Sequence, residues 1–222
     1  MAISDHIPFI ASTLQLLYPK TETFLHYQKD WQLLFATILS AQATDRSVNQ
    51  ATEKLFARFP TLDDYREENR TDILSCIKAV GLSNAKAGYL IQSAKILAEE
   101  YNGTLPKDRE KLVLLPGCGH KTASVVLAEL YDFPYIPVDT HVHRVSARLG
   151  IVTEKTSPEK TEERLEKLFQ GYHAIHLHRQ LILFGRNICH ALHPECATCP
   201  FLSFCPFGQK QTKNVEKASQ RS

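Results

Sequence analysis

The stretch that decides the fold is Leu112–Ala123, with the sequence LVLLPGCGHKTA. A short helix from about Asp108 is predicted to enter it, and Pro116 and Gly117 end that helix. Gly119 is predicted to close a tight hairpin, because glycine accepts backbone angles that other residues avoid. A second helix is predicted to follow, with a buried face made of Ala123, Val126, Leu127 and Leu130. The sequence therefore predicts two helices joined by a glycine hairpin.

A hairpin of this kind exposes backbone N–H groups at the N-terminus of its second helix. Those groups and the helix dipole favour an anion, and a DNA phosphate fits there. Such contacts hold the DNA backbone without reading its sequence. The alternative is an ordinary helix–turn–helix corner inside a core, because short glycine motifs also arise without a ligand.

Lys121 would lie in the first turn of the second helix, where a cation is disfavoured. A neutral amine is a nucleophile and an ammonium is not, so this position would favour a reactive lysine. The alternative is a solvated lysine, which is the usual fate of this residue type. Asp139, within PVDTH (Pro137–His141), is predicted to cap a helix from Thr140 to Leu149. The same carboxylate can serve in catalysis, because a cap residue is held rigidly by the backbone it binds.

Four of the six cysteines form a second signal, with the spacing C-x6-C-x2-C-x5-C. They are Cys189, Cys196, Cys199 and Cys205. In a reducing compartment such a group indicates a metal site rather than disulfides. Four thiolates in so short a loop can surround one Zn²⁺ or one iron–sulfur cluster, and the spacing alone does not separate the two. Four protein ligands leave no open position, so we expect a structural site.

The rest of the chain reads as helical. Apolar residues recur at steps of three or four, which predicts an all-α fold of about eleven short helices. The last stretch, residues 209–222, is polar and basic, which predicts a disordered tail.

The composition bounds the class of protein. The 222 residues are 43% hydrophobic and 23% charged, as in a globular protein with a sizeable core. The net charge of +2 does not by itself indicate a nucleic-acid partner. The sequence shows no bilayer-spanning apolar run and no signal-peptide pattern, so we expect the cytoplasm.

Five motifs together resemble bacterial endonuclease III, in the same order and at compatible spacing. Three are the hairpin, VDTH (Val138–His141) and the cysteine loop; the other two are LSAQATD (Leu39–Asp45) and GLSNAKA (Gly81–Ala87). The resemblance covers nearly the whole chain, and five motifs in order are highly specific.

The resemblance implies a helix–hairpin–helix DNA glycosylase fold, with two α-helical domains and a DNA-binding cleft between them. Residues 24–134 would form a six-helix domain that contains the hairpin. Residues 1–23 and 135–208 would form the iron–sulfur domain. The implied protein is a bifunctional DNA glycosylase and AP lyase of base excision repair, acting on oxidised pyrimidines and abasic sites in duplex DNA. It would be a monomer, associated with the nucleoid and with no membrane partner.

The resemblance also implies roles for particular residues. Lys121 would attack C1′ of the damaged nucleotide, expel the base and form a Schiff base, and β-elimination would then cut the strand 3′ to the lesion. Asp139 would stabilise the developing sugar cation or assist proton transfer. A [4Fe–4S] cluster would bind the four cysteines of the loop, Cys189, Cys196, Cys199 and Cys205.

Gly117, Gly119 and His120 would contact DNA at the hairpin. A stacked base is unreachable, so the nucleotide must flip out and something must fill the gap. Leu82 suits an inserted wedge, the alternative being a core contact between helices. Gln42 suits the space opposite the orphaned base, the alternative being a polar residue at a helix end.

Two positions in the hairpin depart from the family pattern. His120 stands where a larger basic residue is usual, which weakens its expected grip on phosphate at neutral pH. Cys118 stands where an aliphatic residue is usual. The Lys121 and Asp139 pair is intact.

Two other functions fit parts of the same pattern. An adenine glycosylase acting on mismatches shares the hairpin, the aspartate and the cluster, but it does not need Lys121 and usually carries a large further C-terminal domain. A non-catalytic DNA-binding scaffold would use the hairpin to grip phosphates and the cluster for structure or redox sensing. The presence of both Lys121 and Asp139 argues against the scaffold.

Overall fold

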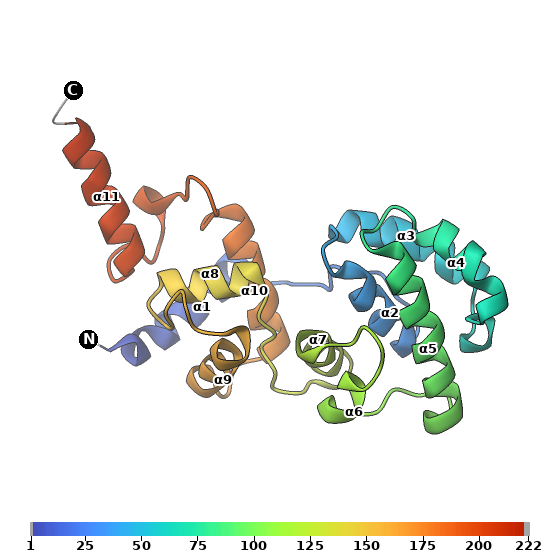
Figure 1. The fold of residues 1–222 in the computed structure, drawn as a ribbon. Helices are drawn as coiled ribbons and strands as arrows, with labels where there is room; N and C mark the ends of the chain where they lie inside the picture. The colour runs from blue at the N-terminus through green and yellow to red at the C-terminus, as the bar shows by residue number, and fades with distance from the viewer. Residues whose placement is uncertain (1, 220–222) are drawn as a thin grey trace. The chain divides into compact units, whose positions relative to one another are not determined.

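Helices make up all the regular structure of residues 2–219, the part of the chain that the computed structural model describes. Within this range there are eleven α-helices, four short 3-10 helices and no β-strand, which confirms the all-α prediction (Figure 1). The α-helices are α1 (Ile7–Leu17), α2 (Asp30–Ser40), α3 (Asp45–Arg58), α4 (Arg70–Ile77), α5 (Ser83–Tyr101), α6 (Arg109–Val113), α7 (His120–Tyr131), α8 (Thr140–Arg148), α9 (Pro158–Leu168), α10 (Ala174–Asn187) and α11 (Pro206–Ser219). The 3-10 helices are η1 (Ile3–His6), η2 (Leu62–Asp64), η3 (Glu67–Asn69) and η4 (Cys196–Thr198). No helix in the described range is both long and apolar enough to cross a bilayer.

The chain divides into two compact units. The hairpin unit comprises Thr23–Phe133 and contains α2 to α7. The cysteine unit combines the described residues of Met1–Glu22 and Pro134–Ser222, with α1 and α8 to α11. The cysteine unit therefore combines segments from the two ends of the sequence, and the hairpin unit lies between them in the chain.

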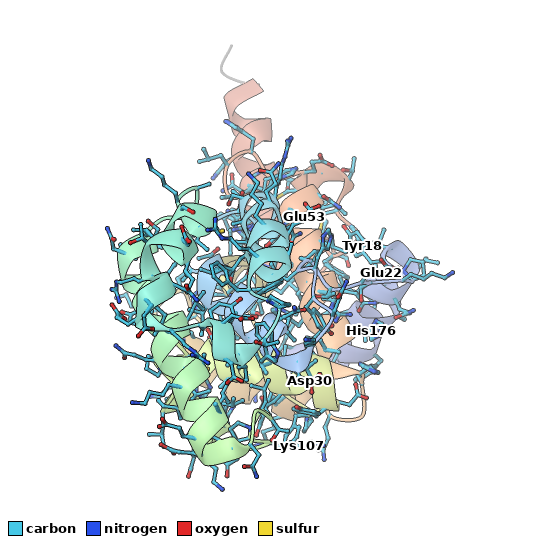
Figure 2. The ribbon with its side chains drawn as sticks, turned by 90° about the vertical axis from the view of Figure 1, so that its right-hand side faces the viewer. Tyr18, Glu22, Asp30, Glu53, Lys107 and His176 are labelled. Carbon is cyan, nitrogen blue, oxygen red and sulfur yellow. The ribbon has the colours of Figure 1, made fainter. Side chains whose placement is uncertain are left out.

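The hairpin unit is built around α2. Every residue from Trp31 to Leu39 is buried, because α2 packs against α3, α5 and α7 on different sides. A helix that is apolar all round is typical of such a central position. The start of α2 is also tied to the end of α7: the hydroxyl of Tyr131 donates to Asp30 Oδ2 at 2.9 Å. Lys107 Nζ lies 4.5 Å from the Tyr131 ring centroid (Asp30 and Lys107 are labelled in Figure 2).

The cysteine unit is organised around α10, which packs on α8 and α1. Its buried polar residues hold the neighbouring loops: Gln180 donates to the carbonyl of Tyr18 at 3.1 Å, and Arg179 donates to that of Thr21 at 2.9 Å. His176 Nδ1 lies 2.8 Å from the Thr21 hydroxyl (Tyr18 and His176 are labelled in Figure 2). His178 Nδ1 lies 2.7 Å from the carbonyl oxygen of Pro137, in the segment that leads into α8.

The predicted disordered tail is wrong for residues 209–219, which continue α11; residues 220–222 lie outside the described range. Pro206 suits the first turn of a helix, and no glycine or proline follows Gly208 to break it. The amide of Gln209 donates to the carbonyl of Cys205 at 3.0 Å, and its side chain donates to that of Ser203 at 2.7 Å. The composition indicated a solvated end, but the helix is anchored at its start by the cysteine loop.

Candidate active site

The hairpin forms as predicted between α6 and α7. Asp108 caps α6, its Oδ1 accepting from the amides of Glu110 at 2.8 Å and Lys111 at 3.3 Å. The connection folds onto the core, with Leu115 and Cys118 buried and the Cys118 amide donating to the Leu115 carbonyl at 3.0 Å. Burial raises the pKa of the Cys118 thiol to about 12, so this cysteine acts as an apolar filler where an aliphatic residue would also pack.

The glycine that makes the tight turn is Gly117, so the prediction for Gly119 is wrong. Gly117 has φ +78°, and a Cβ there would lie 2.7 Å from Tyr89 Cδ2 and 3.0 Å from Ile38 Cγ2. Gly119 has φ −80°, an angle that any residue adopts, and a Cβ there would meet nothing within 4 Å. It is the N-cap of α7 and makes no side-chain cap. Gly119 thus leaves open space before the first amides of α7, where an anion can approach.

The two glycines should respond differently to alanine. Gly117→Ala should destabilise the protein by about 1–3 kcal/mol, because it forces a left-handed angle and a clash with Tyr89. Gly119→Ala should change the free energy of unfolding by less than about 0.5 kcal/mol, yet weaken DNA binding by placing a methyl group before the amides. Urea unfolding and a duplex-binding titration measure the two effects. A stable Gly117→Ala variant would contradict the turn assignment.

Lys121 is exposed in the first turn of α7, as predicted. Beside it, Arg109 Nη1 lies 3.4 Å from His120 Nε2 and donates to Ser124 Oγ at 3.3 Å. A guanidinium only donates, so Nε2 of His120 is the acceptor in this contact. Arg109 therefore brings a permanent positive charge to the hairpin position where His120 replaces a larger basic residue. No local pattern in the sequence marks Arg109, because its contact with α7 depends on the fold of the hairpin.

Asp139 caps α8, as predicted: its Oδ1 accepts from the Val142 amide at 2.8 Å. The cap occupies one of its two carboxylate oxygens, and the side chain is half-buried. The preceding residues Ile136–Val138 are buried, which fixes the backbone from the other side. Burial lowers the pKa of the neighbouring His141, against the opposing effect of Asp139, which favours the neutral imidazole.

Gln42 and Leu82 are both exposed, and both have a left-handed backbone, with φ +56° and +59°. Leu82 is 62% exposed, which excludes the core contact considered from the sequence. It is itself the N-cap of α5, which begins at Ser83. A left-handed leucine is strained, and strain of this kind is concentrated at functional sites.

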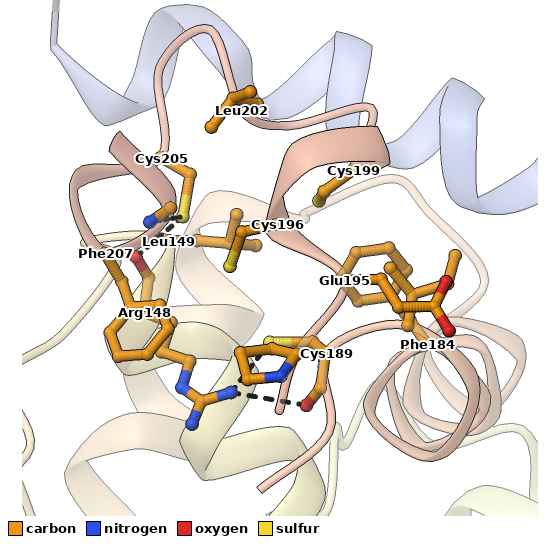
Figure 3. Close-up of a pocket in the computed structure, with 13 residues that line it drawn as sticks. Arg148, Leu149, Phe184, Cys189, Glu195, Cys196, Cys199, Leu202, Cys205 and Phe207 are labelled. Atoms are coloured by element: carbon orange, nitrogen blue, oxygen red, sulfur yellow. Dashed lines mark hydrogen bonds between the residues drawn. The ribbon is translucent and has the colours of Figure 1, made fainter. Parts of the chain in front are cut away.

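The four cysteines of the loop line one shared cavity, with Leu149, Phe184 and Phe207 among its walls (Figure 3). N–H groups point at two of the sulfurs: Arg148 donates to Cys189 Sγ and the Gly208 amide to Cys205 Sγ, both at 3.4 Å. Burial raises the pKa of Cys199 to about 11 and also raises that of Cys196 and Cys205. Thiolates in this cavity therefore need a cationic group beside them. Within the described range, no three His, Cys, Asp or Glu side chains are grouped around a position for a single metal ion.

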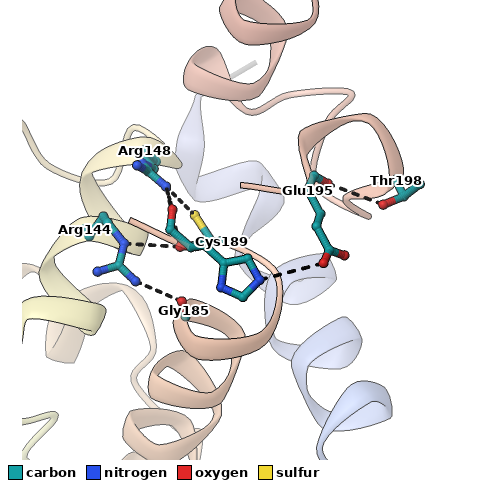
Figure 4. Close-up of polar contacts among 7 residues, drawn as sticks. Arg144, Arg148, Gly185, Cys189, Glu195 and Thr198 are labelled. Atoms are coloured by element: carbon teal, nitrogen blue, oxygen red, sulfur yellow. Dashed lines mark hydrogen bonds and ion pairs between the residues drawn. The ribbon is translucent and has the colours of Figure 1, made fainter. Parts of the chain in front are cut away.

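Two arginines of α8 hold the cysteine loop (Figure 4). Arg144 donates to the carbonyls of Gly185 at 2.9 Å and Cys189 at 3.2 Å. Arg148 donates to those of His190 at 2.6 Å and Ala191 at 3.0 Å. These arginines were not among the residues predicted for the site, although their i, i+4 spacing places them on one face of a helix. The helix that Asp139 caps is thus bonded at its other end to the loop that begins at Cys189.

Residues 35–171 match the HhH-GPD superfamily of base excision DNA repair proteins, a stretch that contains the hairpin, Lys121 and Asp139. The chain belongs to this family. Within it the chain is similar to endonuclease III of Rickettsia conorii, with 44% identity over 85% of this chain and 89% of the relative. Endonuclease III of Bacillus subtilis is 40% identical over 93% of this chain and 94% of the relative, and that of Escherichia coli K12 is 40% identical over 86% and 90%.

Solved structures agree with the HhH-GPD assignment. A trapped covalent intermediate of endonuclease III with DNA has a TM-score of 0.90 at 35% identity, covering 96% of this chain and 100% of that chain. A thermostable thymine-DNA glycosylase, at 23% identity and a TM-score of 0.84, shares the fold. The resemblance to endonuclease III and the helix–hairpin–helix fold are confirmed. The chain is a base excision repair enzyme, a DNA glycosylase with AP lyase activity.

Proposed function

We propose that this HhH-GPD enzyme excises oxidised pyrimidines from duplex DNA through a Schiff base on Lys121. The lysine amine attacks C1′, the bond from C1′ to the base breaks, and the base leaves with a proton. Opening of the sugar gives the Schiff base. Loss of a C2′ proton then breaks the C3′–O bond, which cuts the strand 3′ to the lesion. The observation that carries this proposal is that Lys121 is exposed in the first turn of α7, next to the open space at Gly119.

Asp139 has the complementary role in this proposal. Its carboxylate stabilises positive charge that develops on the sugar as the base leaves, or assists proton transfer to and from the lysine. The cap bond to the Val142 amide supports this role, because it fixes the carboxylate before substrate arrives.

The proposed DNA contacts lie at two places in the hairpin unit. Gly117, Gly119 and His120 would hold a phosphate at the start of α7, with Arg109 adding charge. Leu82 and Gln42 would fill the gap left by the flipped nucleotide, since both are exposed on turns. The resemblance further implies a monomer that works at the nucleoid in the cytoplasm.

Cys189, Cys196, Cys199 and Cys205 are proposed to hold a [4Fe–4S] cluster. The fit rests on the shared cavity, the N–H donors to two of the sulfurs and the raised thiol pKa values. When bound, the cluster would supply iron–thiolate bonds that close the loop, with no position left for substrate. Arg144 and Arg148 would hold the loop on α8.

Replacing one cysteine at a time should distinguish the proposed cluster ligands from the cysteines outside the loop. Cys199→Ser should lower bound iron and sulfide and reduce the melting temperature by roughly 10 °C, because metal binding is coupled to folding of its loop. Cys76→Ser, outside the loop, is the matched control and should keep the iron content of the parent. Iron and sulfide assays with a thermal melt measure both variants. Equal iron in the Cys199→Ser variant would contradict the ligand assignment.

Borohydride reduction tests the proposed reaction. The parent protein, mixed with a duplex that carries thymine glycol or an abasic site, should give a covalent protein–DNA band after reduction. Absence of the band while lesion binding persists would exclude the Schiff base. It would leave a glycosylase whose hydrolysis needs no lysine adduct.

A further inference from the structure

Lys86, in the first turn of α5, is a buried lysine that the proposed chemistry does not use. Its side chain is 2% exposed, and its Nζ donates to the carbonyls of Leu39 at 2.9 Å and Ala41 at 2.6 Å. Burial lowers its pKa, so the buried charge is costly. Those carbonyls belong to the C-terminal end of α2, where the helix dipole is negative and compensates an ammonium.

The carbonyls that Lys86 binds lie directly before Gln42 in the chain. Through its backbone, Lys86 also binds the second loop: its amide donates to the carbonyl of Leu82 at 3.0 Å. The two loops approach each other closely, since a Cβ on Gly81 would lie 3.5 Å from the carbonyl oxygen of Gln42. One residue thus holds, by side chain and by backbone, the turns that carry Gln42 and Leu82.

Both turns need such support. Gln42 and Leu82 have left-handed backbones, which cost roughly 1–2 kcal/mol for each residue that is not glycine. A strained turn persists only where its surroundings determine it. Among the described residues, the hydrogen bonds that link this turn to a side chain of another helix are the two from Lys86. Without the ammonium, the carbonyls of Leu39 and Ala41 lose their charged partner and this turn can relax.

We propose that Lys86 is the positioning residue that sets the spacing of Gln42 and Leu82, so that both side chains enter the duplex together when the nucleotide flips. This inference rests on the proposed roles of Gln42 and Leu82. Lys86 itself is too buried to touch DNA. Its effect is therefore confined to substrates in which a gap in the duplex must be filled.

The test compares Lys86→Met with Lys95→Met. The first keeps the apolar stem and removes the ammonium; the second does the same at an exposed position of the same helix. Excision of thymine glycol from duplex DNA should be at least about tenfold slower in Lys86→Met, because a displaced turn misplaces the inserted side chains. Borohydride trapping on a single-stranded abasic oligonucleotide should stay at the parental level, because it has no gap. Lys95→Met should match the parent on both substrates.

A double-mutant cycle separates positioning from general damage. In a background of Gln42→Ala and Leu82→Ala, adding Lys86→Met should cause little further loss, because its effect acts through those side chains. An equal loss on single-stranded and duplex DNA, an additive loss in the cycle, or no loss on duplex would each overturn the role of Lys86. If Lys86→Met does not fold by thermal melt, Lys86→Gln is assayed in the same way, with an intermediate loss expected.

Assays of the parent protein distinguish a failure of the proposed function from a failure of the proposed role of Lys86. A parent that neither excises nor forms a trapped adduct would refute the proposed function, and the role of Lys86 with it. A parent that is active on both substrates, with Lys86→Met equally active on duplex, would overturn the role of Lys86 alone.

Discussion

Replacing Lys121 with alanine should abolish the covalent complex with abasic DNA and slow strand cleavage by at least roughly 10³-fold. In the proposed reaction the nitrogen of the Lys121 amine bonds to C1′. No other group of the hairpin can form that bond when the amine is removed. Lys121 is exposed, so the free energy of unfolding should change by less than about 0.5 kcal/mol. Borohydride trapping and gel-resolved cleavage of an abasic duplex measure the loss.

Lys95→Ala is the matched control for Lys121→Ala, because it removes an exposed lysine from another helix of the hairpin unit. It should be trapped and cleave at parental rates. Lesion binding by Lys121→Ala should persist, since the amides at the start of α7 remain. A trapped band in Lys121→Ala at parental intensity would show that a different amine forms the adduct.

Local patterns in the sequence predicted the parts of the site that depend on neighbours in the chain. Asp139 caps α8 because an aspartate before a helix binds the amide three residues later, whatever surrounds it. The hairpin follows from Pro116 and Gly117 between two apolar runs. The four cysteines line one cavity, as their close spacing between Cys189 and Cys205 predicted.

The features of the site that the sequence did not predict depend on contacts between segments that are distant in the chain. Gly117, rather than Gly119, makes the turn: its φ is positive, and a Cβ there would meet Tyr89 and Ile38, neither of which is near it in the chain. In the sequence Lys86 is one more charged residue on a predicted helix. In the structure it is buried and donates hydrogen bonds to carbonyls 45 and 47 residues away. Whether a lysine is buried, and which groups replace its hydration, is known only from the folded structure.

The error in the tail has a different physical cause. Polar composition predicts that residues 209–219 bury little, but a helix whose first turn is already formed can extend through residues of good helix propensity. The start of α11 supplies the nucleus, since the Gly208 and Gln209 amides bind Cys205. We expect occupancy of the cysteine site to govern this helix start, because Cys205 is one of the proposed ligands.

Replacing Asp139 with asparagine should slow base excision by roughly 10²–10⁴-fold while the fold is kept. Asparagine caps a helix as well as aspartate does, so the bond to the Val142 amide should persist and the melting temperature should stay close to that of the parent. The change removes the negative charge that the proposed mechanism places near the sugar cation. Single-turnover excision of thymine glycol from a duplex, with a thermal melt of the same sample, measures both quantities.

Asp139→Ala separates the two roles of the residue, because it removes the charge and the cap together. It should match Asp139→Asn in excision rate but be less stable by about 1 kcal/mol, the usual cost of a lost N-cap. If Asp139→Asn excises at the parental rate and Asp139→Ala is slow, the aspartate acts only by holding the start of α8. Catalytic charge would then have to come from elsewhere. If both variants are slow and only Asp139→Ala is less stable, capping and catalysis are distinct functions of one carboxylate.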